Sequence, residues 1–244
     1  MKTAQEPAQP AVVQPAWLGI WFEPGTTRVV QVVDKSPAAA AAIQIGDEIS
    51  SLDGVEMHTS KDIVRTVAPK QPGSKVSIAL TRGGAPRTVT VTLGARPSDD
   101  KLMRATLLDR PAPPFTAEAL DGKASLTLAD LRGHVVLLDF WATWCGPCTT
   151  QYPHLNQWQQ QYASKGLQII ALSDEEPDLV REYATQEKLS YPIAFDPDDR
   201  IRLAYVVAGI PTTVVIDKAG VVRYVALGVV DPAEVERTIT KLLD

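Results

Sequence analysis

Two cysteines three residues apart are the first feature of this sequence that could do chemistry. Cys145 and Cys148 stand in a Cys-Gly-Pro-Cys run, and the chain has no other cysteine. A protein braced by structural disulfides usually scatters its cysteines, and a stable zinc site usually takes about four protein ligands. The pair therefore favours thiol–disulfide exchange over zinc binding or an inert structural bridge.

The flanking residues indicate how the pair would be activated. A nearly continuous apolar run over 135–139 predicts a buried strand, and a helix is expected to begin at the first cysteine. Unpaired N–H groups and the positive dipole end at a helix N-terminus favour a thiolate at Cys145. Cys148 lies one turn further on the same face. We expect Cys145 to attack a substrate disulfide and Cys148 to resolve the mixed disulfide.

Two further residues are candidates for catalysis. Asp139 ends the apolar strand, and burial there would raise its pKa. Such an acid could take the proton from Cys148 during resolution, whereas a helix-capping or solvated aspartate is the alternative. Pro211 follows Ile210 just before an expected strand. A cis bond there would bring the Ile210 backbone beside the cysteines, where it could pair with an extended substrate.

From residue 105 to 244, strand and helix patterns alternate, which predicts an α/β domain. The cysteines would thus lie between a central strand and the helix that follows it. Strands are expected at 135–139, 167–172, 212–216 and 221–226, and helices after the cysteines, from Pro177 and from Asp231-Pro232.

Residues 16–95 predict a smaller and mostly β domain. Alternating apolar residues at 76–80 and 89–93 flank Gly83-Gly84, which indicates a hairpin. Short helices are expected from Ser36-Pro37 and over 60–68. The charged segment 96–104 has no sustained apolar period and is interpreted as a linker, and residues 1–15 as a flexible leader.

Composition narrows the partners. The net charge is −5 with no dense Lys/Arg run, which argues against nucleic acid or an anionic membrane surface. No stretch reaches the roughly 18–20 apolar residues of a membrane helix. Residues 1–10 lack the apolar region of an intact secretion signal. Either the protein is cytosolic or a leader has been removed.

Residues from about 110 to 244 resemble the thioredoxin superfamily, in particular its TlpA/ResA-like branch of bacterial extracytoplasmic thiol–disulfide proteins. The resemblance implies a thioredoxin fold with a central mixed sheet flanked by helices. It implies that Cys145 attacks, that Cys148 resolves and that Pro211 is the cis-proline. Pro153 matches the proline that kinks the active-site helix. The matching segments are APPFTAEALDGKASLTLADLRGHVVLLDFWATWCGPC, YPIAFDPDDRIRLAYVVAGIPTTVVIDKAG and the closing helix.

Departures from that branch leave the proton route open. Gln151 stands where some ResA-like proteins have glutamate, and Asp139 instead resembles thioredoxin at that position. The strand 167–172 has no lysine, where thioredoxin keeps a charge partner for its acid. The Gly-Pro dipeptide and Ile210 are thioredoxin-like choices that suggest a reductant. We assign substrate binding to the residues around the cysteines and before the proline: Trp144, Gly146, Pro147 and Ile210.

Residues 16–95 resemble a bacterial HtrA-type PDZ domain. The resemblance implies that the loop Leu18-Gly19-Ile20 offers N–H groups to a peptide carboxylate, and that the peptide adds as a strand. Ile63 and Val67 would line the groove. The alternative is that Leu18, Ile20, Ile63 and Val67 are plain core. The matching segments are WLGI, VVDKSPAAAAAIQIGDEISSLDGVEM and TVTVTL.

Together these features predict a thiol–disulfide oxidoreductase that reduces disulfides of extracytoplasmic partner proteins, while the PDZ domain recruits a peptide or protein. Its partners would be protein thiols or disulfides and an electron-donor protein, with a membrane involved only through a removed leader or anchor. No metal and no cofactor beyond the redox-active disulfide are expected. The alternatives are a PDZ adaptor with a redox-sensing half, and a disulfide oxidase or isomerase. The resemblance places the protein in the periplasm or another extracytoplasmic compartment.

Overall fold

The computed structural model describes residues 14–120, 122, 125–196 and 199–244. The chain divides into two compact units, with the division between Pro97 and Ser98. The expected leader, 1–15, lies outside the described residues except for its last two. Among the helices of the described residues, none has the length and apolar character needed to cross a membrane.

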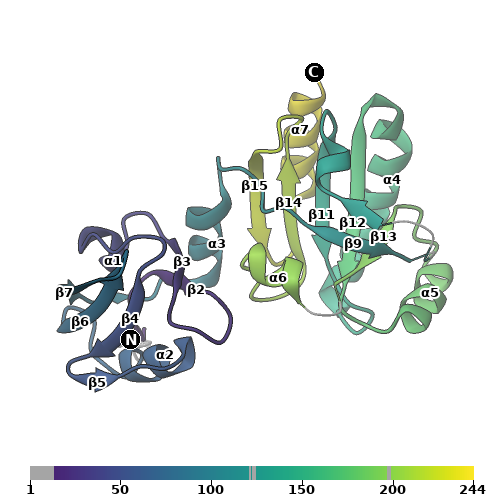
Figure 1. Ribbon diagram of the computed structural model, residues 1–244. Helices are drawn as coiled ribbons and strands as arrows, with labels where there is room; N and C mark the ends of the chain where they lie inside the picture. The colour runs from purple at the N-terminus through teal and green to yellow at the C-terminus, as the bar shows by residue number, and fades with distance from the viewer. Residues whose placement is uncertain (1–13, 121, 123–124, 197–198) are drawn as a thin grey trace, which may run out of the picture. The chain divides into compact units, whose positions relative to one another are not determined.

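The first unit is mostly strand (Figure 1). A four-stranded antiparallel sheet has the order β5-β4-β6-β7, and β2-β3 and β1-β8 form two-stranded pairs. The expected hairpin is present, because β6 and β7 pair along their whole length across Gly83-Gly84. The strands are β1 (Ala16–Trp17), β2 (Ile20–Phe22), β3 (Val29–Val32), β4 (Glu48–Leu52), β5 (Val55–Glu56), β6 (Lys75–Arg82), β7 (Ala85–Thr92) and β8 (Gly94–Ala95).

Both helices of this unit begin at capping side chains. In α1 (Pro37–Ala40), Ser36 Oγ accepts the Ala39 N–H at 3.2 Å, as the Ser-Pro pattern predicts. In α2 (Ser60–Val67), Thr59 and Asp62 form a capping box, so the cap lies one residue before the expected start.

The second unit is built on a seven-stranded mixed sheet of order β10-β9-β13-β12-β11-β14-β15. Strand β11 lies inside the sheet, parallel to its neighbour β12 and antiparallel to its neighbour β14. The strands are β9 (Thr116–Ala119), β10 (Ser125–Thr127), β11 (Val135–Phe140), β12 (Leu167–Ser173), β13 (Ile193–Phe195), β14 (Thr212–Ile216) and β15 (Val222–Leu227).

Helices cover both faces of this sheet. Alternate residues of β11 point to opposite sides, so each face meets a different set of helices. Val135 and Leu137 pack with one set of helices, and Val136 and Leu138 with the other. The structure therefore has the expected thioredoxin-type arrangement of a mixed sheet between helices. The first set is α4 (Tyr152–Tyr162), α5 (Pro177–Gln186) and α7 (Pro232–Leu243), and the second is α3 (Asp99–Leu107) and α6 (Arg200–Ala204).

Helix α3 replaces most of the expected linker 96–104. Leu102, Met103 and Leu107 are buried, and α3 packs beside β15 (Figure 1). The interpretation as a linker was wrong because the segment 96–104 stops three residues before the end of the helix at Leu107. The apolar face continues to Leu107, past residue 104, while the charged residues occupy the opposite face.

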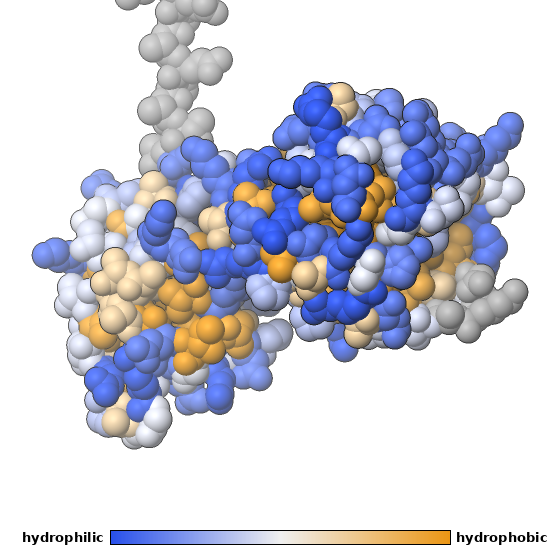
Figure 2. Space-filling model, turned by 90° about the horizontal axis from the view of Figure 1, so that it is seen from above, coloured by the Kyte–Doolittle hydropathy of each residue, from blue (hydrophilic) through white to orange (hydrophobic). Residues whose placement is uncertain are grey.

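The surface mixes hydrophilic residues with apolar patches on the face that Figure 2 presents. Large exposed apolar side chains include Val64 on α2, Trp144 before the first cysteine and Leu203 on α6. Single exposed apolar residues are common on soluble proteins. Val64 and Trp144 differ from the ordinary case because each lies beside residues predicted to function.

Candidate active site

Strand β11 leads directly into the cysteine loop. Pairing continues one residue beyond the strand, since the Trp141 N–H donates to the Leu172 carbonyl at 3.1 Å. A tight turn follows, in which the Cys145 N–H donates to the Ala142 carbonyl at 3.1 Å. The expected helix begins as a 3-10 segment, η2 (Gly146–Thr150), with Cys145 at its N-cap. The α-helix proper, α4, starts only at Tyr152.

Prolines occupy the first turn of each of these two helices. Pro147 lies in the first turn of η2 and Pro153 in the first turn of α4. A missing N–H is tolerated there because the first N–H groups of a helix have no intrahelical acceptor. The change from 3-10 to α geometry coincides with Pro153, the residue matched to the helix-kinking proline.

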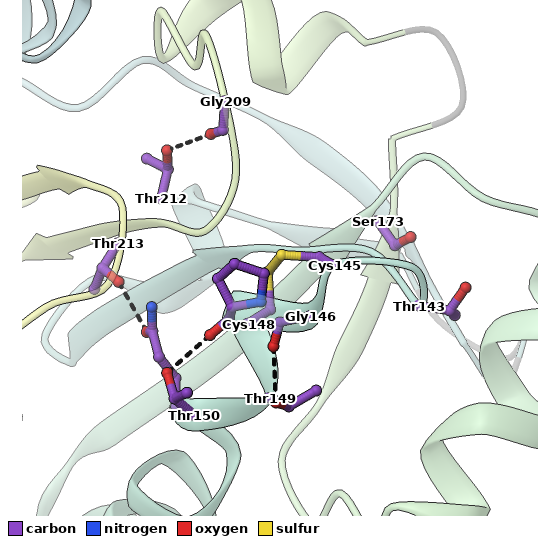
Figure 3. The surroundings of a disulfide bond; sticks show 12 residues. Thr143, Cys145, Gly146, Cys148, Thr149, Thr150, Ser173, Gly209, Thr212 and Thr213 are labelled. Atoms are coloured by element: carbon purple, nitrogen blue, oxygen red, sulfur yellow. Dashed lines mark hydrogen bonds between the residues drawn. A yellow bond between two sulfur atoms is a disulfide. The ribbon is translucent and has the colours of Figure 1, made fainter.

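Cys145 and Cys148 form a disulfide, with their Cα atoms 5.4 Å apart (Figure 3). Both cysteines are buried, Cys148 at 0% and Cys145 at 3% exposure, but Cys145 stands between the exposed residues Trp144 and Gly146. Trp144 is 74% exposed, and Pro147 is exposed as well. A partner would therefore reach this disulfide from the side of Cys145.

The Ile210–Pro211 peptide bond is cis. It leads into β14, and the Thr212 hydroxyl donates to the Gly209 carbonyl at 2.7 Å within the turn (Figure 3). Ile210 lines a small hollow together with Trp141 and Trp144. The structure thus brings Ile210 to the cysteine loop, although the two segments are far apart in sequence.

Asp139 is buried in the sheet, 1% exposed. Loss of hydration raises the pKa of its carboxyl to about 7. Its neighbours in register are Ala171 on β12 and Thr213 on β14. Ala171 brings no charge to the acid, and Asp139 Oδ1 has no hydrogen-bond partner among the described residues.

Neutral polar groups surround Asp139 on the face of the sheet that α4 covers. Thr213, the β14 neighbour of Asp139, donates to Gln151 Oε1 at 3.2 Å (Figure 3). Burial, then the charge of Asp139, raises the pKa of Tyr191. Gln151, noted in the sequence only as a departure, is thus a buried member of the acid's surroundings.

Sequence reasoning missed Glu175, which follows β12. Its carboxylate accepts the Thr143 N–H at 2.6 Å and the Thr143 hydroxyl at 2.7 Å. An acid just after a strand end is the only sequence signal, and it does not identify Thr143 as the partner. The contact matters because Thr143 is two residues before Cys145.

The predicted carboxylate loop of the first unit is tightly held. Gly19 has φ +84°, and a Cβ there would lie 2.2 Å from Ser36 Cβ. The carbonyls of Leu18 and Gly19 accept the N–H groups of Ala38 and Val33, both at 2.9 Å. Glycine is therefore required both by the backbone conformation and by the close approach of Ser36.

The structure does not place Ile63 and Val67 at an open groove. Both belong to the core with Leu18, at 1% and 4% exposure, while Ile20 is half-buried. Their spacing of four residues puts them on the face of α2 that packs inward. Val64, 60% exposed, is the outward apolar residue of α2.

The fold and the disulfide define a thioredoxin-type thiol–disulfide oxidoreductase that follows a PDZ domain. The model of the AhpC/TSA family matches residues 108–225, and the model of the PDZ domain matches residues 16–93. The thiol-disulfide oxidoreductase ResA of Bacillus thuringiensis is 36% identical over 136 residues, which is 55% of this chain and 78% of the relative. The chain belongs to the ResA family of thiol-disulfide oxidoreductases.

Solved structures agree with this placement. A thioredoxin-family thiol:disulfide interchange protein from Chlorobium tepidum has a TM-score of 0.50 and 32% identity, covering 56% of this chain and 97% of that one. A second Chlorobium tepidum protein, assigned as a DsbE thiol:disulfide interchange protein, has a TM-score of 0.53 and 33% identity. It covers 56% of this chain and 98% of its own. Each of the three relatives covers little more than half of this chain.

Proposed function

We propose that the protein reduces disulfides of extracytoplasmic partner proteins, with Cys145 attacking and Cys148 resolving. The observation that carries this proposal is the Cys145–Cys148 disulfide at the start of a helix, with both sulfurs buried and exposed residues on either side of Cys145. The names of the relatives support the reaction class. The compartment follows from the substrate, because protein disulfides persist where conditions are oxidising.

The reaction begins with the reduced dithiol. The Cys145 thiolate attacks one substrate sulfur, the substrate disulfide breaks, and its other sulfur leaves as a thiolate that takes a proton. The Cys148 thiol then loses its proton and attacks the Cys145 sulfur. The second substrate sulfur leaves and is protonated. Two electrons pass to the substrate, and the protein is left with the Cys145–Cys148 disulfide.

Asp139 is the proposed acceptor of the Cys148 proton. Its pKa near 7 suits an acid–base group that works around neutral pH, since it can both take and return a proton there. Both groups belong to the same side of the sheet, where Cys148 packs with Trp141 and Tyr152. The neighbour of Asp139 on β12 is Ala171, which is uncharged. This supports the role, because a cation at that position would keep the carboxyl ionised.

Substrate binding is assigned to the rim of the disulfide. Trp144 offers an exposed aromatic face beside Cys145, and the exposed Gly146 and Pro147 leave the approach open. Ile210 lines the hollow it shares with Trp144, which supports contact with the residues next to the substrate cysteine. Pro211 has no N–H, so the backbone before it is free to pair with an extended chain rather than with the sheet.

The PDZ unit is the proposed recruiting module. Strand β2 pairs with β3, and within the described ranges no strand covers its other edge, which suits addition of a peptide strand. On α2, Val64 shares a surface hollow with Lys61 and Arg65. These residues favour a peptide that combines an apolar side chain with acidic groups. Ile63 and Val67 support the helix from inside.

Insulin reduction by dithiothreitol tests the reaction. The wild type should accelerate precipitation of the insulin chains, and Cys145→Ser should reduce the rate to that of dithiothreitol alone. Glu176→Gln, an exposed change outside the site, controls for handling. Equal rates for wild type and Cys145→Ser would instead support a PDZ adaptor.

Equilibration with glutathione separates the possible directions of electron flow. A reductant should have a potential toward the thioredoxin value of about −270 mV, whereas a value toward about −120 mV would indicate an oxidase. The proposal requires no metal and no cofactor other than the Cys145–Cys148 disulfide.

A further inference from the structure

The loop before the cysteines is held by a carboxylate from another part of the chain. Glu175 lies between β12 and α5 and grips Thr143 through two bonds, of 2.6 Å to the N–H and 2.7 Å to the hydroxyl. Hydrogen bonds to an ionised acceptor are shorter and stronger than neutral ones. Each oxygen of Glu175 thus accepts one hydrogen bond from Thr143 of the cysteine loop.

Glu175 is itself tied to the sheet. The Ser173 hydroxyl donates to Glu175 Oε2 at 3.3 Å, and Ser173 Oγ accepts the Glu175 N–H at 3.3 Å. Ser173 is the last residue of β12, is 2% exposed, and belongs to the strand next to β11. The Glu175 carboxylate is thus anchored to the end of β12 by the hydrogen bonds with Ser173.

The hydrogen bonds inside the cysteine loop show what the contact with Glu175 adds. The N–H groups of Cys145 and Gly146 donate to carbonyls within the loop, those of Ala142 and Trp144. The Thr143 N–H goes to Glu175 instead. Without the Glu175 carboxylate, the loop would keep its internal hydrogen bonds, but Thr143 would lose its attachment to the end of β12.

We propose that Glu175 is a positioning residue for disulfide exchange, holding Thr143 and, through it, the Cys145 sulfur in the orientation from which it attacks. The inference rests on the proposed role of Cys145 as the attacking thiol. Glu175 acts by geometry, since its charge alone would oppose a thiolate nearby. Geometry and charge can be separated because glutamine has one acceptor for the Thr143 N–H and one donor for the Thr143 hydroxyl oxygen.

Three variants test the inference. Glu175→Gln keeps both contacts without the charge, and Glu175→Ala removes both. Glu176→Ala is the matched control, because Glu176 is the exposed neighbour and makes no side-chain cap bond to α5. Thr143→Ala removes only the hydroxyl contact and replaces Glu175→Ala in the test if that variant does not fold, which its melting temperature would reveal.

The measurement is the rate at which iodoacetamide labels Cys145 in the reduced full-length protein, followed against pH and assigned by peptide mass spectrometry. Loss of two charge-assisted bonds should slow labelling near neutral pH about tenfold in Glu175→Ala and less in Thr143→Ala. Glu175→Gln should stay within about threefold of the wild type, given its retained contacts. Glu176→Ala should match the wild type.

The outcomes distinguish this inference from the proposed function. If the wild-type Cys145 is labelled no faster than an unstructured peptide thiol, the role of Cys145 fails. Fast wild-type labelling that is unchanged in Glu175→Ala, or in Thr143→Ala where it stands in, overturns only the role of Glu175. Equal changes in Glu175→Gln and Glu175→Ala overturn positioning by geometry, since they would trace the effect to charge.

Discussion

Replacing Asp139 with asparagine is expected to stabilise the protein above neutral pH. Burial moves the pKa of this carboxyl from 3.8 to about 7 on folding. Below the unfolded value, the group is protonated in both states and costs nothing. As the pH rises toward the folded value, the unfolded chain ionises first, so stability falls, and the loss is complete above about pH 7.

The size of the effect follows from the two pKa values of Asp139. Each pH unit between them corresponds to about 1.4 kcal/mol, so the buried acid costs on the order of 4 kcal/mol at high pH. An asparagine side chain at this position would remove that cost while keeping the shape. Stability of Asp139→Asn should therefore match the wild type near pH 4 and exceed it by several kcal/mol near pH 8.

Guanidinium unfolding of the oxidised protein at both pH values measures the difference, with the transitions of the two units fitted separately. Working with the disulfide intact keeps Cys145 and Cys148 from titrating. Glu176→Gln controls for the loss of one negative charge at an exposed position. A stability gain of Asp139→Asn that is the same at both pH values would refute burial as its cause.

Three further predictions concern other residues. Cys148→Ser should accumulate a mixed disulfide with insulin on non-reducing gels and lose turnover; no trapped species would refute its resolving role. Gly19→Ala should destabilise the first unit by about 2 kcal/mol or more in thermal unfolding, because of its φ and the contact with Ser36 Cβ; an unchanged melting point would contradict this. Arg82→Ala should lower the melting temperature of the first unit, because the buried Asp47 carboxylate would lose its 2.7 Å partner; an unchanged melting temperature would contradict this.

Local patterns were sufficient to predict the parts that carry the chemistry. The six residues of β11 are all buried, which is why a run interrupted only by Asp139 is otherwise apolar. The Ser36 cap and the Gly83-Gly84 turn depend on contacts between residues close in sequence, so a short stretch of sequence is enough to predict them. The resemblance placed Pro211, whose cis bond the sequence alone would not single out.

Long-range contacts set the limit of that prediction. The grip of Glu175 on Thr143 depends on β11 and β12 being neighbours, which no short window contains. Ile63 points into the core because of the side of α2 that packs inward, and the residues of α2 alone do not determine that side. Strand β9 was missed because it is short and pairs with β13, which lies far from it in the sequence.

Helix α3 also determines where the redox unit can be excised as an independent fragment. Met103 and Leu107 form part of one apolar cluster with Val222 and Val225 of β15. A fragment that opens at residue 105 would strip half of that cover and present bare aliphatic surface to solvent, which favours self-association. A fragment that opens at Ser98 would retain the cover, so expression of the catalytic half alone should start there.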